Sequence, residues 1–444
     1  MAHISLCCTL TATANGIAAS GGRCKIPSDS INAEHEAGRT PHTAQLIHLP
    51  SALDFTHPKV QQVLGAADCI VFQRNTITSD VWSAMDYWRS LGKVITIDLD
   101  DAYPSLPPSN PAHAYWILNK GGMPVNPPDA LAEGLKHADA LTSPSKVLLK
   151  DWEHIIPGFW IPNWPRRAWY GKNDKGIGPN PKPYGSQDIM FGYKPDEENG
   201  QIMQFNGNFR PGSDGWIVMG WGGSISHVDS WVYSGICEAL DLLFEKYSNL
   251  RLKFCGFESR LDYILDRWGD RVIKQAGVKP EHWPYMVSTF DIGLAPLDMR
   301  PVPSNTGKDG EVKWEGGEYS YDERRSWLKG VEYMCAGVPW VATRSATYEG
   351  IAHHGIMIEN GNHLTQAQRS DNWYRGLDNV IGSIAAKKKL AEEKKKWALK
   401  KMTMESQVNT FAETYERIAN LKRAGKGGVG LPNVQWYKAV QVAA

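Results

Sequence analysis

The segment from Ser326 to Thr343 places a lysine and a glutamate where they could bind a nucleotide. It reads SWLKGVEYMCAGVPWVAT. Lys329 and Glu332 are three residues apart, so on a helix they lie on one face. An ammonium group pairs with phosphate and a carboxylate accepts hydrogen bonds from ribose hydroxyls, so the pair suits a sugar nucleotide. The alternative is a surface ion pair that contributes less than about 1 kcal/mol to stability.

A glycine-rich segment from Gly220 to Trp231, GWGGSISHVDSW, follows an apolar run and opens a predicted helix. Its glycines would let a phosphate approach backbone N–H groups, and the helix N-terminus adds partial positive charge. The Ser224 hydroxyl can donate a hydrogen bond, and His227 can donate or accept one. Many α/β loops need such a turn only for its backbone freedom, so both interpretations stay open.

Three carboxylates lie within DLDDAY, at the end of a predicted strand. Clustered carboxylates of this kind can bind a hard divalent cation. They can equally accept hydrogen bonds from loop amides and shape a cleft. A metal site at Asp98, Asp100 and Asp101 is the less favoured interpretation, because the two segments above lie in the other half of the chain. No Walker loop, HExxH motif or Ser/His/Asp order is present.

Short apolar runs alternate with helical patterns in both halves of the chain, as in parallel sheets covered by helices. The predicted strands are 3–10, 66–74, 93–101, 215–223, 250–257, 288–297 and 338–344. The predicted helices include 79–93, with Ser79 as its cap, and 230–247. Residues 131–152 predict a helix, a short strand and a second helix. We therefore expect an α/β protein with two successive Rossmann-like units.

A stretch rich in Pro, Gly and Asn, from about 157 to 215, separates the two halves and predicts a linker with loops. The predicted division is an N-terminal Rossmann-like domain at 1–165, a linker or insert at 166–214, a second Rossmann-like domain at 215–385 and a helical tail at 386–444. We expect the tail to pack back on the first domain. Its Lys-rich start, 385–401, predicts a solvated amphipathic helix, with a basic patch for a polyanion such as DNA as the alternative.

Composition agrees with a globular protein of two domains. The chain has 444 residues, and 48 Lys plus Arg balance 48 Asp plus Glu, which argues against a general attraction to nucleic acid or anionic membrane. Seven scattered cysteines without a CxxC pair favour reduced thiols and disfavour structural zinc. The N-terminal segment has no basic leader, and no apolar run is long enough for a membrane span, so we expect a cytoplasmic protein. The 18 tryptophans are unusual, and most are expected to pack in cores.

Five blocks of the sequence resemble, in order, those of GT-B glycosyltransferases, specifically the retaining family-4-like group of bacterial and phage enzymes. ADCIVFQR…GKVITIDLDDAY is similar to the acceptor domain's strand, helix and Asp-rich strand end. HADALTSPS and WIPNWPRRAWY look like its Ala-Asp…Thr-x-Ser strand and the Ile-Pro-Asn bridge between domains. WGGSISHVDSW, STFDIGLAPL and the stretch from Ser326 to Tyr348 resemble donor-domain blocks. The resemblance implies two Rossmann-like domains with parallel sheets facing a central cleft.

The resemblance also implies a donor site made of seven residues. These are Gly222, Gly223, Ser224, Val278, Lys329, Glu332 and Tyr333. The glycines and Ser224 would lie near the diphosphate, Lys329 on phosphate and Glu332 on ribose. The Val278 backbone and Tyr333 would lie near the base and ribose. His227, Arg74 and Asp100 would face the cleft as candidate catalytic residues.

Two features depart from the family pattern. Many relatives carry a second glutamate eight positions before the ribose-binding one, and here that position is Arg324, with Glu323 beside it. The loop 298–325 is longer than the pattern requires, and 171–214 looks inserted. The donor sugar therefore stays open, and the insert is a candidate part of an acceptor site.

The implied function is transfer of a hexose or pentose from a nucleotide sugar, with a UDP-sugar as the expected donor, to an acceptor hydroxyl on a glycan, a small molecule or modified DNA. The family implies retention of configuration and no metal or tightly bound cofactor. Fixed hydrogen-bond donors would stabilise the departing diphosphate. Domain closure would exclude water.

Three alternatives remain. A phage-type enzyme could glycosylate hydroxylated DNA bases in a host cytoplasm, an idea motivated by the Lys-rich tail and Pro165-Arg166-Arg167. An inactive relative could bind sugar nucleotides or glycans on the same fold, because fold does not guarantee activity. A metal-dependent transferase would use the carboxylates of DLDDAY. Neither the acceptor nor the oligomeric state follows from the sequence.

Overall fold

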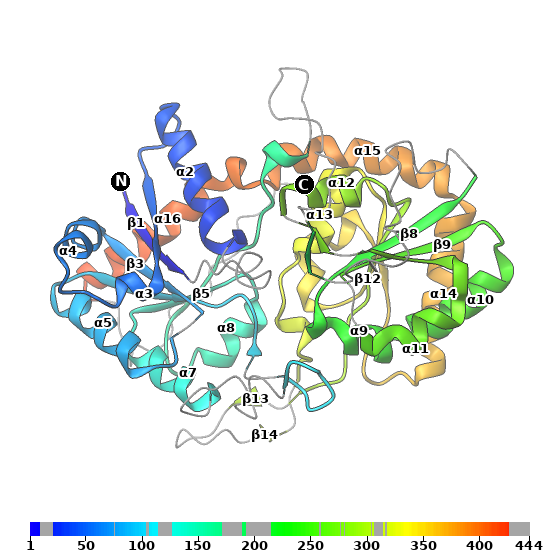
Figure 1. Ribbon diagram of the computed structural model, residues 1–444, viewed down its shortest axis with the longest axis horizontal. Helices are drawn as coiled ribbons and strands as arrows, with labels where there is room; N and C mark the ends of the chain where they lie inside the picture. Colours follow the sequence, from blue (N-terminus) through cyan, green and yellow to red (C-terminus); the bar gives the residue numbers. More distant parts are fainter. Residues whose placement is uncertain are drawn as a thin grey trace, which may run out of the picture.

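Two parallel sheets form the core of the protein, and in the computed structural model they lie side by side, each covered by helices (Figure 1). The structure describes residues 1–8, 21–74, 76–103, 106–113, 127–170, 189–191, 215–256, 259–275, 277–278, 280–302, 304–305, 314–315 and 318–425. No helix among these residues is long and apolar enough to cross a membrane.

The N-terminal sheet has six parallel strands in the order β2-β1-β3-β4-β5-β6. Their bounds are β1 His3–Cys8, β2 Thr43–His48, β3 Cys69–Gln73, β4 Val94–Asp98, β5 Ala140–Ser143 and β6 Gly158–Trp160. The helices of this unit are α2 Ile26–Glu36, α3 Leu49–Ala52, α4 Pro58–Gly65, α5 Ser79–Ser90, α7 Pro127–Lys136 and α8 Lys146–Trp152. Strand β3, CIVFQ, is buried at every residue because helices cover both faces of the sheet.

The second sheet is also parallel and has the order β10-β9-β8-β12-β15-β16. Its strands are β8 Ile217–Gly222, β9 Leu250–Cys255, β10 Val272–Gln275, β12 Ile292–Ala295, β15 Trp340–Thr343 and β16 Ile356–Ile358. The helices are α9 Val228–Tyr233, α10 Ile236–Lys246, α11 Asp262–Leu265, α12 Trp283–Val287, α13 Leu328–Ala336 and α14 Gln366–Gly382. In chain order this is 3-2-1-4-5-6, the Rossmann arrangement, so the α/β prediction is confirmed.

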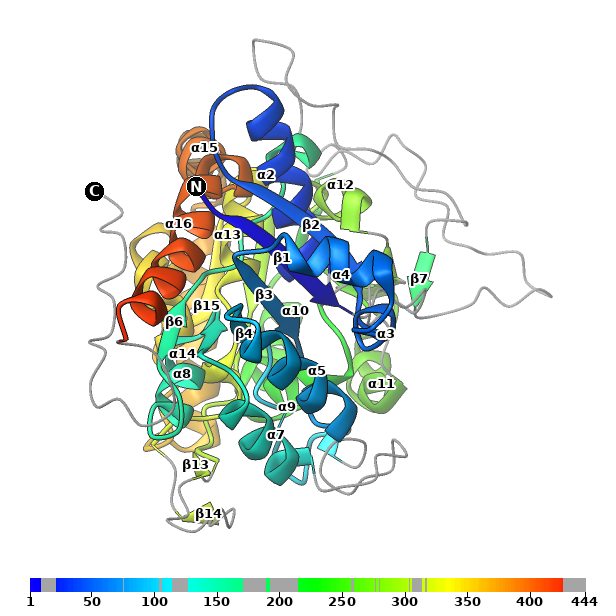
Figure 2. The ribbon, with the colours of Figure 1, turned by 90° about the vertical axis from the view of Figure 1, so that its left-hand side faces the viewer.

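Two long helices end the described chain and connect the units. α15, Ile384–Lys401, lies along the second unit, where it packs on α13. α16, Met404–Arg423, returns to the first unit and packs on α2, β3 and β4. Phe411, Tyr415 and Ile418 recur at helical spacing on its buried face. Figure 2 shows α16 on one side of the first sheet, with α4 and α5 on the other.

The local differences from the predicted elements have physical causes. The helix predicted at 230–247 is two helices, because Gly235 between them has φ 82° and a Cβ there would lie 2.7 Å from the Ser370 nitrogen. Ser79 is not the cap of α5: Thr78 holds that position, without a side-chain cap bond. Strand β6 lies inside the stretch predicted as linker and loop, where its three residues were too short to show a period.

Candidate functional site

Helix α13 carries Lys329 and Glu332 to the carboxyl end of the second sheet. Lys329 Nζ donates a hydrogen bond to the carbonyl of Gly222, the last residue of β8, and lies 5.4 Å from the centre of the Trp221 ring. Glu332 Oε2 accepts a hydrogen bond of 2.9 Å from the Trp283 indole nitrogen. The helix ends at Gly337, which has φ 76° and caps it. The two side chains therefore flank the end of the central strand of this sheet.

Both groups keep some accessible surface, but protein surrounds their charged ends. Burial lowers the pKa of Lys329 to about 8, while the neighbouring Glu332 raises it. Burial raises the pKa of Glu332 to about 7, against the lowering effects of the Trp283 hydrogen bond and of Lys329. Of the described residues, only Gly222 accepts a hydrogen bond from the Lys329 ammonium. A ligand with phosphate and hydroxyl groups would supply the compensation that the protein leaves incomplete.

Packing requires glycine at the last residue of β8 and at the residue that follows it. A Cβ on Gly222 would lie 2.1 Å from the Trp283 ring, and one on Gly223 would lie 2.5 Å from the Trp221 ring. Ser224 follows and precedes the 3₁₀ turn η5, Ile225–His227, which leads directly into α9. The loop backbone therefore lies close to two indole rings at the start of a helical segment. This geometry agrees with the phosphate-loop interpretation and also accounts for the glycines structurally.

Arg325, which the sequence did not predict as a site residue, keeps His227 as a neutral imidazole. Its Nε2 lies 2.9 Å from Nη1 of Arg325, so Nε2 is the acceptor and we assign the proton to Nδ1. Burial lowers the pKa of His227 well below its usual value, and the charges of Arg325 and Lys329 lower it further. Arg325 also donates to Asp322 (2.7 Å) and to the Ser226 carbonyl (2.7 Å). No local motif marks Arg325, because His227 is 98 residues away in sequence.

Arg74 and Asp100 lie together at the carboxyl edge of the first sheet. Arg74 has φ 66°, and it is the only non-glycine residue with positive φ in the described chain. Such a conformation costs energy and is often found at functional sites. Arg74 Nη2 lies 3.7 Å from a carboxylate oxygen of Asp101. Burial raises the pKa of Asp100 to about 6, although Arg74 lowers it.

Asp98 has a structural role at the same edge. Arg23 donates to both of its carboxylate oxygens, and Thr142 Oγ1 donates to Oδ2 at 2.7 Å. The Arg23 guanidinium also reaches the Ile161 carbonyl (2.7 Å) and the Asn163 side chain (2.8 Å). Among the described residues there is no group of three or more His, Cys, Asp or Glu placed to hold a metal ion. The metal interpretation of DLDDAY gains no support from these contacts.

Two further predicted donor residues are part of the packing. Tyr333 is buried, and its hydroxyl donates to the Leu294 carbonyl at 2.8 Å. Its ring lies against Gly293, where a Cβ would be 2.6 Å away. Val278 is buried in the two-residue strand β11, Gly277–Val278, which pairs with β7, Ile189–Phe191. Tyr333 therefore packs against β12 of the second sheet.

Arg324, which stands where many relatives carry a glutamate, forms a contact between the two units. Arg324 donates to both carboxylate oxygens of Asp151 in α8, at 2.6 and 2.9 Å, and also to two backbone carbonyls. Its side chain is only 1% exposed, so the Arg324 guanidinium is buried within this ion pair. The adjacent Glu323 accepts a 2.9 Å hydrogen bond from the Ser320 backbone. A glutamate at 324 would place like charge against Asp151.

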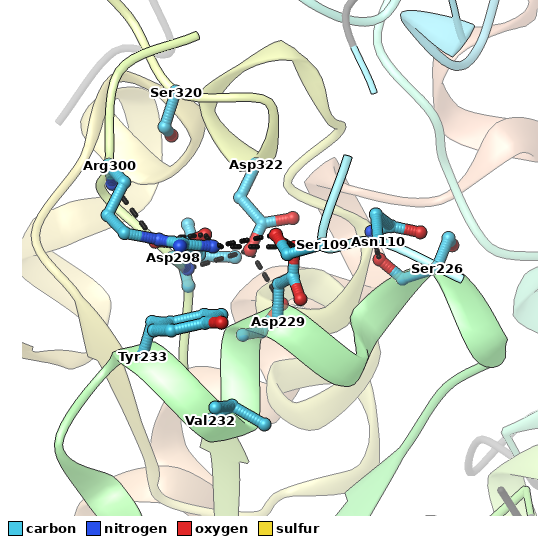
Figure 3. A network of polar contacts seen from close by, with 12 residues as sticks. Ser109, Asn110, Ser226, Asp229, Val232, Tyr233, Asp298, Arg300, Ser320 and Asp322 are labelled. Atoms are coloured by element: carbon cyan, nitrogen blue, oxygen red, sulfur yellow. Dashed lines mark hydrogen bonds and ion pairs between the residues drawn. The ribbon is translucent and has the colours of Figure 1, made fainter. Parts of the chain in front are cut away.

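A second set of contacts joins the units at Ser109 and Asn110 (Figure 3). Ser109 donates to Asp229 at 2.7 Å, and Asn110 donates to the Ser226 carbonyl at 2.9 Å. Arg300 reaches the Ser109 hydroxyl at 3.1 Å. Burial raises the pKa of Asp229 to about 6, while the Ser109 hydrogen bond lowers it. The loops of the two units therefore touch next to the segment that carries Gly223 and His227.

Comparison with known proteins identifies the fold. No family model and no curated protein matches the chain. Sucrose-phosphate synthase from Thermosynechococcus elongatus is similar in structure, with 10% identity over 94% of this chain and 99% of that one, at a TM-score of 0.52. A glycosyltransferase from Rickettsia africae matches with 10% identity over 94% and 98% of the chains, at a TM-score of 0.52.

Trehalose-6-phosphate synthase (OtsA) is similar with 11% identity over 94% of this chain and 99% of that one, at a TM-score of 0.52. A structure described as trehalose-6-phosphate from E. coli bound with UDP-2-fluoro glucose matches with 10% identity over the same shares, at a TM-score of 0.50. Together with the two six-stranded parallel sheets, this likeness confirms the predicted GT-B fold.

Proposed function

We propose that the protein transfers a sugar from a nucleotide-sugar donor, a UDP-sugar in the first instance, to an acceptor hydroxyl. The observation that carries the proposal is the partly accessible Lys329–Glu332 pair beside the end of β8. Ligands of open α/β sheets bind at the carboxyl ends of the strands, where this pair lies. The UDP-2-fluoro glucose in one structure of the same fold supports this donor class.

The donor would bind with its diphosphate at the backbone of Gly223 and Ser224. Lys329 would move from the Gly222 carbonyl to a phosphate oxygen, and Glu332 would accept hydrogen bonds from the ribose. The base would lie near Val278. Lys329 would then pair with a charged phosphate oxygen in place of a neutral carbonyl, which strengthens its hydrogen bond.

The transfer we propose needs no bound metal. As the bond between the anomeric carbon and the diphosphate oxygen breaks, negative charge develops on the diphosphate, and the ammonium of Lys329 stabilises it. The fixed guanidinium of Arg325 adds positive potential one side chain further away. The acceptor oxygen forms the new bond to that carbon, with retention of configuration, and its proton leaves with the diphosphate or passes to a base.

Asp100 is the carboxylate that we propose for the proton-transfer role at the first sheet. A carboxyl group with a pKa of about 6 changes protonation near neutral pH, as a general base must. Arg74 would hold it in place from its unusual backbone conformation. His227 stays neutral because its pKa is lowered, so it is not suited to act as a cationic acid, and its Nδ1 is buried without a hydrogen-bond partner among the described residues.

A thermal-shift screen tests the donor site. Purified protein is heated with UDP, GDP, ADP and their sugar conjugates, with and without Mn²⁺. A nucleotide at a hundred times its Kd should add about 2.7 kcal/mol to the free energy of unfolding. Stabilisation by one nucleotide that Lys329→Met and Glu332→Gln both weaken, and that the exposed control Lys389→Met retains in full, supports the proposal. No stabilisation by any nucleotide would refute it.

Turnover distinguishes a transferase from a binding protein. Release of free nucleotide from the stabilising conjugate, measured with a coupled assay, is the expected result, whereas binding without release would identify an inactive relative. Chelation with EDTA should leave the rate unchanged. The described residues show no contact that favours the DNA-base or inactive alternatives over transfer to a sugar or small-molecule hydroxyl.

A further inference from the structure

A cavity of about 500 Å³ lies between the two units and helix α16, apart from the Lys329–Glu332 pair. One wall comes from the loop between β5 and α8, including Ser145 and Lys146. The opposite wall is the turn from Ala346 to Gly350, and α16 closes a third side with Thr410 and Thr414. Its volume falls within the range of about 300–1,000 Å³ that is typical of small-molecule sites.

Three tryptophans, Trp160, Trp164 and Trp327, line the cavity. The rings of Trp160 and Trp327 meet edge to face, with centres 5.1 Å apart and planes at 79°. Each indole N–H is tied to a backbone carbonyl, Trp160 at 2.9 Å and Trp327 at 3.1 Å. Trp164 and Trp327 are each only 6% exposed, so the flat apolar surface open to a ligand comes mainly from Trp160, whose N–H is already hydrogen-bonded.

The charged residues of the lining balance each other. Three are acidic and three are basic, namely Glu323, Glu349 and Glu413 against Lys146, Arg325 and Arg417. An anion or a cation would meet no net attraction here. A purely apolar ligand would remove water from these charged groups, which is unfavourable. The lining therefore favours a neutral ligand that has apolar faces and several hydroxyl groups, because each hydroxyl can both donate and accept a hydrogen bond.

We propose that this cavity is a second binding site that takes a neutral carbohydrate of one or two pyranose rings. The apolar C–H face of a pyranose would lie against Trp160, which is the partly exposed ring of the three. Its hydroxyls would reach Glu323, Glu349 and Lys146, whose ammonium lies 4.8 Å from the centre of the Trp160 ring. The cavity is distinct from the proposed donor site in that neither Lys329 nor Glu332 lines it, although Arg325 does.

Arg325 is the structural link between the two sites. It lines the cavity and also donates to His227, which lies behind the glycine loop. A carbohydrate in the cavity is thus one side chain away from the segment that we propose for the diphosphate. The cavity also spans both units and α16, so its occupant would touch parts of the chain that are far apart in sequence.

The test fills the cavity with a larger side chain on helix α16. Thr410→Trp places an indole into the cavity from α16, whereas Asn409→Trp puts the same side chain on the exposed face of that helix, outside the lining. Saturation-transfer NMR with maltose, cellobiose, lactose and trehalose, each at tens of millimolar, reports binding to each full-length protein. Circular dichroism and melting temperature check that both variants fold.

We expect one or more of these disaccharides to bind wild type, Asn409→Trp and the donor-site variant Lys329→Met alike. Binding to Thr410→Trp should fall at least tenfold. If Thr410→Trp still bound the sugar, the sugar would bind elsewhere and the proposal would be wrong. The proposal would also be wrong if none of the four disaccharides bound to the wild-type protein. If the apolar dye ANS bound in a Thr410-sensitive way and no disaccharide did, the cavity would be a site for apolar ligands instead.

Discussion

The carboxyl edges of the two sheets both carry charged side chains, yet they treat those charges differently. At the first edge, Asp98 is 2% exposed, and Arg23 and Thr142 occupy both of its oxygens. At the second edge, Lys329 and Glu332 keep some accessible surface and have few partners among the described residues. The Asp98 arrangement is therefore complete without a ligand, whereas Lys329 and Glu332 are only partly compensated.

Asp98 thus stabilises the fold, whereas the Lys329–Glu332 pair is the one that we propose contacts a ligand. Burial would lower the pKa of Arg23, but Asp98 raises it above its usual value, so the two ions stabilise each other. For Lys329 and Glu332, burial moves both pKa values toward neutral pH, so each group is poorly compensated when charged. Carboxylate clusters in a sequence therefore identify a site only when their partners are known.

The largest expected effect comes from Arg23→Met, which leaves the Asp98 carboxylate buried without its cation. We expect a loss of about 3–5 kcal/mol in the free energy of unfolding, measured by urea denaturation. The control Lys25→Met removes an exposed ion pair with Asp29 and should change stability by less than about 1 kcal/mol. If both substitutions changed the free energy of unfolding equally, the buried Arg23–Asp98 pair would be no more important for stability than an exposed ion pair.

The next effect is a pH dependence due to Glu332. Its pKa is 4.5 in an ordinary setting and about 7 in the folded protein, so the folded state binds the proton more tightly. The stabilising contribution is therefore complete below about pH 4.5 and is lost as the pH rises through about 7, by less than about 3 kcal/mol. Glu332→Gln should flatten this part of the stability curve, whereas the exposed Glu393→Gln should leave it unchanged.

Lys329→Met should act on affinity more than on stability. Loss of a hydrogen bond to a charged phosphate costs about 1.5–3 kcal/mol, or roughly a 10- to 100-fold rise in the nucleotide Kd measured by calorimetry. Stability should fall by much less than in Arg23→Met, since a desolvated ammonium is also removed. A wild-type Kd retained in the variant would show that Lys329 does not contact the nucleotide.

The smallest effect concerns the contact between the two edges. Ser109→Ala removes the 2.7 Å hydrogen bond to Asp229 and should cost about 1 kcal/mol of stability. The exposed Ser83→Ala, within α5, serves as the control for loss of a serine hydroxyl. An unchanged unfolding curve for Ser109→Ala would mean that this contact between the units contributes little.

The alternation of buried runs and helical patterns was sufficient to predict the two α/β halves. The strands β3, β4 and β8 were found because continuous apolar runs are visible locally. Strands β2 and β16 were not predicted: β2 is polar at several positions, and β16 has only three residues. Helix α13 and the shared face of Lys329 and Glu332 follow from a spacing of three residues, which needs no tertiary information.

The sequence by itself therefore determined the fold class and the residue types at the carboxyl edge of the second sheet, because both depend on neighbours within a few residues. Only the tertiary structure decided which charges are already paired. Arg23 meets Asp98 across 75 residues, Arg325 meets His227 across 98, and Arg324 meets Asp151 across 173. Such pairs depend on how sheets and loops pack, and a linear pattern carries no record of that packing.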